Sequence, residues 1–242
     1  MLQFFTLIRL LYRFLKELQV GRLFVSATGT GVGKSYATLA LIRSFAARGI
    51  RPGVCKPIET GVTKVPEDAS LLLREAQRHN RAFDSLTPEQ ITAALFPLPA
   101  APFCADTRHR LDRTHLFEKV EELQERCDVL LIEGAGGLMV PIEKEYFMID
   151  LARDLGAFTL LVTPSKLGCI NETLLSLEAL RHRRMEHDWC VNLHEDVREF
   201  PSVTQPFYDA AFPGWWSLQE GVEAFVERFL QIEKHPTRKE KR

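Results

Sequence analysis

The sequence lacks a basic excess, a paired cysteine pattern and a long apolar run, and each absence argues against a class of protein. A formal net charge of -1 removes the electrostatic footprint that nucleic-acid-binding proteins usually carry. We therefore expect no nucleic-acid partner. The five cysteines are odd in number and include no Cys-x-x-Cys pair, which argues against a zinc site or a disulfide framework. We expect reduced thiols in a cytoplasmic protein.

The apolar residues at the start of the chain, MLQFFTLIRLLYRFLKELQV, are interrupted by Arg9, Arg13 and Lys16. No stretch therefore reaches the roughly 18 apolar residues of a membrane span, and a signal peptide would place its positive charge before the apolar run. Three interpretations stay open: an amphipathic helix packed on the domain or a partner, an interfacial membrane helix, or an extension from an upstream start codon. We assign residues 1–21 to a helical N-terminal extension without stable membrane insertion.

The composition instead suits one folded domain, because 242 residues with 45% hydrophobic and 26% charged content can bury a full core. Strand-like runs lie near 23–27, 53–56, 129–133, 159–163 and 189–193. Helical patterns lie near 34–47, 68–79, 114–126, 146–154, 171–184 and 217–232. This alternation predicts an α/β fold, with a mainly parallel sheet covered by helices on both faces. We expect one domain over 22–232 and a polar tail over 233–242.

Ligands of such sheets bind beyond the carboxyl ends of the strands. The proline-rich residues 95–103, LFPLPAAPF, predict an extended connection. Two placements stay open for it, one along the ligand edge and one as a surface loop.

The stretch SATGTGVGKS, residues 26–35, joins the first strand to the first helix and meets the requirements of a phosphate-binding loop. Its glycines allow the chain to pass close to phosphate oxygens at the positive end of a helix. Lys34 would contact the β- and γ-phosphates, and the hydroxyl of Ser35 is a usual Mg²⁺ ligand. A strict loop has glycine at position 28, where this chain has Thr28. The stretch predicts a P-loop nucleotide-binding fold, with a plain glycine-rich turn as the alternative.

The run KPIETG, residues 56–61, ends the second strand with a lysine followed by proline. At the carboxyl edge of a parallel sheet, Lys56 would face the same crevice as Lys34 and place two ammonium groups at one anionic reacting centre. Thr60 would add a hydroxyl donor. Taken alone, such a lysine is more often a surface charge, and its pairing with the phosphate loop favours the functional interpretation.

Two carboxylates are candidates for a metal site. The apolar strand in DVLLIEGAGG, residues 128–137, ends at Glu133, which is the usual position of a Mg²⁺ partner in phosphate-loop enzymes. The alternative for Glu133 is an acid that caps the glycine-rich turn. Asp68 either supplies a second metal carboxylate or caps the helix that starts there.

Together these motifs resemble the dethiobiotin synthetase family, whose loop Gly-Thr-Asp-Thr-x-Val-Gly-Lys-Thr is one residue longer than the strict form. Residues 27–35 follow that loop, with alanine, glycine and serine at three places. The family's strand-end Lys-Pro, with Ser or Thr four residues after the lysine, is met at 56–60. Its Glu-Gly-Ala-Gly-Gly is met at 133–137, and KLGCIN at 166–171 matches the segment before a later helix.

The resemblance implies an ATP-dependent enzyme that joins CO₂ to 7,8-diaminopelargonic acid, with ATP and Mg²⁺ as cofactors. It also implies a homodimer whose substrate site lies at the subunit interface. Lys34 and Lys56 would be catalytic, and the metal would be bound through Ser35, Asp68 and Glu133. The nucleotide would be bound by Thr30, Gly31, Val32, Gly33, Lys34, Ser35, Tyr36, Glu133, Gly134, Ala135, Gly136 and Asn192. The substrate would be bound by Thr60, Gly168, Cys169, Ile170 and Asn171.

The resemblance weakens toward the carboxyl end, where the family has an Asn-Asp pair and a later Pro-Trp-Leu-type segment around the adenine. Here Asn192 is followed by Leu193, and PGWW at 213–216 does not align with that segment. We therefore expect the protein to hold the nucleotide mostly by its phosphates and to discriminate poorly among bases.

Two other functions share this type of fold. A nucleotide-switch ATPase of the septum-positioning or plasmid-partition type carries a second lysine early in the loop, in Lys-Gly-Gly-x-Gly-Lys, where this chain has Gly29. An amide-forming ligase of cobalamin synthesis adds a glutaminase domain, for which we expect no room in 242 residues. Both are less consistent with the paired lysine motifs and Glu133.

Overall fold

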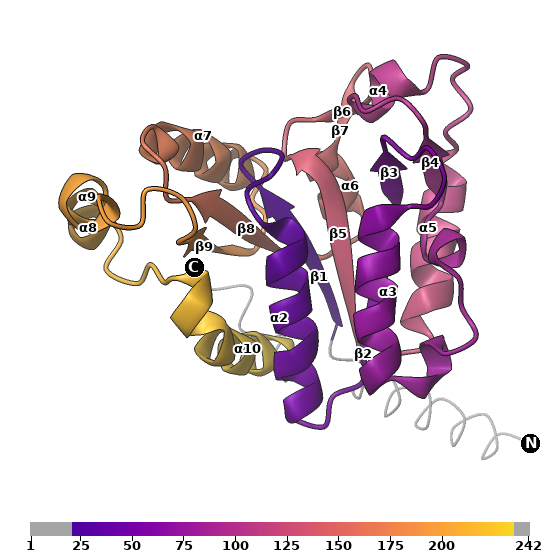
Figure 1. The fold of residues 1–242 in the computed structure, drawn as a ribbon, viewed down its shortest axis with the longest axis horizontal. Helices are drawn as coiled ribbons and strands as arrows, with labels where there is room; N and C mark the ends of the chain where they lie inside the picture. The colour runs from indigo at the N-terminus through magenta and orange to yellow at the C-terminus, as the bar shows by residue number, and fades with distance from the viewer. Residues whose placement is uncertain (1–20, 235–242) are drawn as a thin grey trace, which may run out of the picture.

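The protein, seen here in a computed structural model that describes residues 21–234, is built on a five-stranded parallel sheet (Figure 1). The strands are β1 (Gly21–Ala27), β2 (Pro52–Cys55), β5 (Val129–Gly137), β8 (Phe158–Pro164) and β9 (His187–Asn192). They lie in the order β2-β5-β1-β8-β9, and every neighbouring pair is parallel. Because both faces are covered, the inner strands are continuous apolar runs, and residues 129–132 are fully buried.

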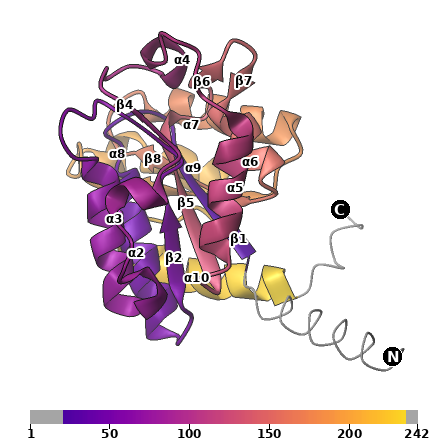
Figure 2. The ribbon, with the colours of Figure 1, turned by 90° about the vertical axis from the view of Figure 1, so that its right-hand side faces the viewer.

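Helices cover both faces of this sheet (Figure 2). On one face, α2 (Lys34–Ala47) packs between α3 (Glu67–His79) and α10 (Leu218–Lys234). On the other face lie α5 (Arg113–Gln124), α6 (Met148–Asp154) and α7 (Cys169–His182). This arrangement confirms the predicted single α/β domain with a mainly parallel sheet of the P-loop type.

Short elements that the sequence pattern did not predict lie outside the sheet. β3 (Ile58–Thr60) pairs with β4 (Ala94–Phe96), and β6 (Pro141–Glu143) pairs with β7 (Tyr146–Phe147). The remaining elements of the described chain are α4 (Pro102–Ala105), α8 (Phe200–Val203), α9 (Gln205–Ala211) and the 3-10 turns Arg81–Phe83 and Pro88–Ile91. Most span only two to four residues, too few for a periodic signal.

The prediction of an extended connection at 95–103 is partly wrong. The segment contains the end of β4 and the start of α4, and Pro99 lies beside Gly61 just after β3. The pairing of β4 with β3 places this segment next to the chain that follows Lys56.

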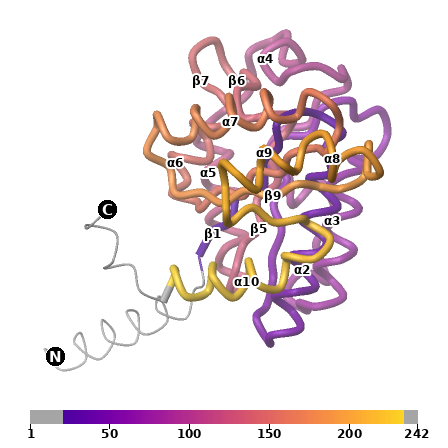
Figure 3. Tube along the Cα trace, turned by 90° about the vertical axis from the view of Figure 1, so that its left-hand side faces the viewer, coloured from indigo at the N-terminus to yellow at the C-terminus, as the bar shows by residue number. Residues whose placement is uncertain are grey.

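A second, smaller core lies at the β9 edge, where α8 and α9 pack beside α7 (Figure 3). Its buried aromatic side chains are Trp189, Phe200 and Tyr208. The tryptophans of PGWW also pack inward, because Trp215 contacts Phe200 while Trp216 stacks on Phe225 with ring centroids 5.3 Å apart. These two tryptophans therefore hold α10 and the smaller core in place.

The described elements begin and end close to the predicted domain boundaries. The first described element, β1, starts at Gly21 and the last, α10, ends at Lys234, which is one residue before and two residues after the predicted 22–232. The predicted helical N-terminal extension, residues 1–21, lies outside the described residues except for Gly21, which begins β1. Among the helices of 21–234, none combines the length and apolar character of a membrane span.

Candidate active site

The register of the sheet brings two predicted strand-end charges together. Cys55 of β2 pairs with Ile132 of β5, so the next residues along the two strands are Lys56 and Glu133. Lys56 Nζ lies 2.7 Å from Glu133 Oε1. The Lys56 side chain is 2% exposed and that of Glu133 is fully buried. The two motifs thus form a buried ion pair at the carboxyl edge.

Asp68 adds a second carboxylate to this pair from the first turn of α3. Lys56 Nζ donates a hydrogen bond to Asp68 Oδ2 at 2.8 Å and to the carbonyl of Gly134 at 3.3 Å. Burial alone would lower the pKa of Lys56, but Glu133 and Asp68 outweigh it and the pKa is raised. Lys56 is therefore an ammonium ion at neutral pH. Held in this way, it presents a preorganised positive charge to the site.

The phosphate loop turns tightly between β1 and α2. Gly33, the N-cap residue of α2, has a φ of 107°, and a Cβ atom there would collide with the side-chain amide of Asn192. Glycine is required at this position by both conformation and space. Lys34 Nζ donates to the carbonyl of Gly29 at 3.1 Å, so the lysine folds back over its own loop.

The charge of Lys34 is incompletely balanced. Burial, followed by repulsion from Lys56, lowers the pKa of Lys34 to about 8, while Glu133 and Asp68 act in the opposite direction. An anion close to Lys34 would favour its charged form and raise this pKa again. The loop is therefore electrostatically suited to a phosphate group.

Glu133 also contacts two hydroxyl groups of α2. Ser35 Oγ donates to Glu133 Oε1 at 3.0 Å, and Thr38 Oγ1 donates to Glu133 Oε2 at 2.8 Å. Thr38 is a contact of Glu133 that the sequence motifs did not predict. A signal was available, since Thr38 lies four residues after Lys34 and therefore on the same side of the helix, one turn along.

Ser35, Asp68 and Glu133 supply one hydroxyl and two carboxylates, which are the hard oxygen donors that Mg²⁺ prefers. Glu133 Oε1 connects the set, because it accepts from Ser35 and shares Lys56 with Asp68. Over residues 21–234, no group of three or more His, Cys, Asp or Glu side chains forms a metal cage. A site with so few protein ligands fits Mg²⁺ that is also bound by phosphates.

A pocket of about 340 Å³, the phosphate pocket, opens over these groups. It is lined by Thr30, Gly31, Gly33, Lys34, Ser35, Tyr36, Lys56, Glu59, Thr60, Asp68, Ala135 and Gly136. All of these except Glu59 are predicted site residues. Of the other predicted nucleotide residues, Val32, Glu133 and Gly134 are buried close behind the lining.

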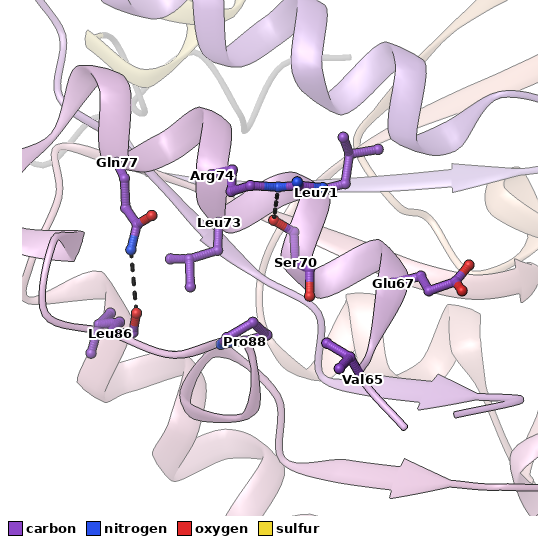
Figure 4. Close-up of a pocket in the computed structure, with 9 residues that line it drawn as sticks. All are labelled: Val65, Glu67, Ser70, Leu71, Leu73, Arg74, Gln77, Leu86 and Pro88. Atoms are coloured by element: carbon purple, nitrogen blue, oxygen red, sulfur yellow. Dashed lines mark hydrogen bonds between the residues drawn. The ribbon is translucent and has the colours of Figure 1, made fainter. Parts of the chain in front are cut away.

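A larger groove, of about 670 Å³, lies along another face of α3 (Figure 4). It runs between α3 and the 3-10 turn that begins at Pro88 and includes Val65, Glu67 and Leu86. Its lining, within the part of the chain that the structure describes, does not include the predicted site residues. The groove and the phosphate pocket are thus separated by α3.

Asn192, predicted to contact the nucleotide, is buried beneath the phosphate loop. Its Nδ2 donates to the carbonyl of Val32 at 2.9 Å, and its Oδ1 accepts from Gln219 Nε2 at 2.8 Å. The side-chain amide is therefore bonded to the protein on both sides. In this structure it supports the loop from below.

The predicted substrate segment 168–171 forms the start of α7. Gly168 is the N-cap residue, with a φ of 94°, and Cys169 is buried. The lining of the phosphate pocket, over the described residues, does not include this segment. A link exists nonetheless, because Thr28 Oγ1 of the phosphate loop lies 3.3 Å from Glu172 Oε2 in the first turn of α7.

A glycine-rich loop at the carboxyl edge of a parallel sheet, with its own lysine and a second buried lysine, defines a P-loop nucleotide-dependent enzyme. A family model described as an AAA domain matches residues 21–190. The chain is 56% identical over 204 residues to the ATP-dependent dethiobiotin synthetase BioD of Sulfurovum sp. (strain NBC37-1), covering 84% of this chain and 97% of the relative. The chain belongs to the dethiobiotin synthetase family.

A second relative supports the family assignment, and a solved structure shows the fold. The dethiobiotin synthetase of Wolinella succinogenes is 48% identical over 211 residues, covering 86% of this chain and 97% of the relative. Among solved structures, a plasmid partition protein from Borrelia burgdorferi superposes with a TM-score of 0.53 at 8% identity, covering 88% of this chain and 96% of that chain. At that identity, the structural likeness shows the shared fold alone.

Proposed function

We propose that this protein is an ATP-dependent dethiobiotin synthetase, a cyclo-ligase that inserts CO₂ between the N7 and N8 amines of 7,8-diaminopelargonic acid. One amine and CO₂ give a carbamate and a proton. The carbamate oxygen takes the γ-phosphoryl group of ATP and ADP leaves. The second amine then attacks the carbonyl carbon of this mixed anhydride, loses a proton and expels phosphate, which closes the ureido ring of dethiobiotin.

The observation that carries the proposal is the placement of Lys34 and Lys56 in one pocket. Every intermediate of the reaction is an anion, so two adjacent ammonium groups stabilise the charge that builds up during the transfer. Lys34 would hold the β- and γ-phosphates, and Lys56 would hold the carbamate and the transferring phosphoryl group. Thr60, which lines the same pocket, would orient the diamine.

Ser35, Asp68 and Glu133 would hold Mg²⁺ beside the phosphates. When bound, the ion would neutralise phosphate charge during transfer. Glu133 has a further role that belongs to the protein itself, because it positions Lys56, Ser35 and Thr38 through its two oxygens. We also propose that the enzyme is cytoplasmic and that residues 22–232 form its synthetase domain.

We further propose that a homodimer completes the substrate site, with the backbone amides of 168–171 holding the substrate carboxylate across the subunit interface. The first N–H groups of α7 are suited to this, because the helix start has a glycine at its N-cap and the helix dipole favours an anion. Leu167 and Leu175, which are 77% and 63% exposed around this helix start, support an interface here.

Phosphate release from ATP, measured with and without 7,8-diaminopelargonic acid and bicarbonate, tests the function. A ring-closing synthetase releases phosphate only when both are present and forms dethiobiotin in equal amount. Hydrolysis that needs neither would instead favour the partition-type switch and contradict the proposal.

A further inference from the structure

Glu59 is a buried carboxylate in the pocket wall to which the proposed reaction assigns no role. It lies in β3, just after the Lys56-Pro57 pair, and is 6% exposed. Its Oε1 accepts a hydrogen bond from the backbone N–H of Asp68 at 3.0 Å, and its Oε2 accepts one from the backbone N–H of Ala69 at 2.9 Å. Both carboxylate oxygens are thus bonded to the first turn of α3.

The N-terminus of α3 depends on this contact, because its own N-cap residue cannot provide one. That residue is Pro66, whose side chain cannot accept a hydrogen bond. The first N–H groups of a helix have no intrahelical partner, and leaving such groups unsatisfied in a buried place costs free energy. Glu59 therefore does from a neighbouring strand what an N-cap Ser or Asp does within the helix, and its charge suits the helix dipole.

The contact also bears on the reaction centre, since Asp68 is one of the two residues that Glu59 holds. The Asp68 carboxylate lies 2.8 Å from Lys56 Nζ, but its side chain is 48% exposed, so it is less enclosed than Lys56 or Glu133. The backbone N–H of Asp68 is hydrogen-bonded to Glu59, and the Asp68 carboxylate is bonded to Lys56. Both partners lie on one short stretch of chain.

We propose that Glu59 is a positioning residue for catalysis, which fixes the backbone of Asp68 so that the Asp68 carboxylate faces Lys56 and the phosphate pocket. Because both of its oxygens are bonded to the backbone amides of Asp68 and Ala69, Glu59 acts through Asp68. This inference rests on the proposed function, in which Asp68 serves Lys56 and Mg²⁺.

A double-mutant cycle with Glu59→Ala and Asp68→Ala tests this inference. If Glu59 acts through Asp68, E59A lowers kcat/KM for ATP about tenfold or more in the wild-type background but less than about twofold in the D68A background. If the losses in kcat/KM caused by E59A and D68A were strictly additive in free energy, the proposal would be overturned. Calorimetric affinity for Mg²⁺ with a non-hydrolysable ATP analogue gives the same cycle a readout that does not depend on turnover.

Glu59→Gln covers the case in which E59A does not fold. The amide keeps one acceptor oxygen but turns an NH₂ group toward the second backbone N–H. E59Q should therefore lose about half as much in kcat/KM as E59A. Hydrogen exchange of peptides from the start of α3 should be faster in E59Q than in the wild type, while exchange in α2 stays unchanged. Unchanged exchange together with wild-type activity in E59Q would contradict the inference.

Glu67→Gln is the matched control. It removes a carboxylate from the same first turn of α3, but Glu67 is exposed and lines the groove of Figure 4 instead of the phosphate pocket. Its kcat/KM should stay within about twofold of the wild type, since exposed substitutions of this kind have small effects. The wild type in the same assay tests the proposed function separately. An inactive wild type would sink that function, while the affinity cycle and the exchange data would still decide the role of Glu59.

Discussion

The carboxyl edge of the sheet has two halves that use their polar side chains differently. At the ends of β2 and β5, Lys56 forms ion pairs with Glu133 and with Asp68 of the adjacent α3. At the end of β9, the amide of Asn192 is bonded to the loop carbonyl of Val32 and to Gln219. Ionic partners can be exchanged when a charged ligand arrives, whereas an amide bonded to backbone holds the chain itself. The first half is arranged to bind and react, and the second to support the loop.

Lys56→Ala should disrupt the half at the ends of β2 and β5, and it should have the largest effect. It leaves the carboxylate of Glu133 buried without its cation, which costs about 3–5 kcal/mol of stability. Loss of a preorganised charge should also lower kcat by about 10²–10³. Dethiobiotin formation and urea unfolding measure the two effects. Lys64→Ala, at an exposed lysine of the following loop, is the control and should change neither. Full synthetase activity in K56A would remove the central role assigned to Lys56.

Gly33→Ala tests how far the two halves depend on one another, because the added methyl group enters the space of the Asn192 amide. Gly31→Ala is its matched control. Both glycines have a positive φ, of 107° and 77°, and alanine at either costs about 1–3 kcal/mol. Only Gly33 is crowded, since an added Cβ at Gly31 has no described atom within 4 Å. G33A should therefore melt at a lower temperature and bind ATP more weakly than G31A. Equal melting temperatures would contradict this.

Lys34 should make nucleotide binding depend on pH. Its pKa of about 8 means that the ammonium is present below this pH and is lost as the pH rises through it. Because the charged form binds the triphosphate, affinity for Mg·ATP without the diamine should fall, by up to about tenfold per pH unit, above pH 8. Lys34→Arg keeps its charge in this range and should remove the fall. An affinity for the wild type that is constant across this range would argue against the assignment.

Exchange of the base should have the smallest effect. The Asn192 amide is bonded to the protein, and Trp215 and Trp216 pack among other aromatic side chains. Because these side chains already have partners within the protein, we expect weak discrimination, with GTP and CTP supporting rates within about tenfold of ATP. Strict use of ATP would show that residues at the end of β9 recognise the base.

The sequence predicted the large elements because their signals are local. The helix expected over 34–47 matches α2 at both ends, since the loop glycines precede its start and Gly49 follows its end. The helix expected over 146–154 begins at Met148, because Tyr146 and Phe147 pair with the strand at 141–143. This hairpin is local, but strands of two or three residues are too short to leave a periodic pattern in the sequence.

For the candidate site, too, local signals were predictable from the sequence and tertiary contacts were not. Motifs of fixed spacing pointed to every residue that lines the pocket except Glu59, although the predicted Asn192 and 168–171 lie outside that lining, and the roles assigned to these residues stay predictions. A glutamate in KPIETG gives no local sign of its partners, which are amides at the start of α3. The nearest hint is Pro66, which leaves that helix without a cap. The bonds of Asn192 to Val32 and Gln219 likewise depend on tertiary placement.

The pairing of Cys55 with Ile132 also sets how long the reaction centre persists. Buried strand pairs separate only when a large part of a protein unfolds, whereas helix ends at the surface open locally and far more often. Lys56 and Glu133 therefore keep their spacing for the lifetime of the folded state. Asp68 lies in the first turn of a helix, so local opening displaces it more often than it displaces Lys56 or Glu133. The pairing of Lys56 with Glu133 is therefore persistent, and the more frequent fluctuations of the centre should arise at α3.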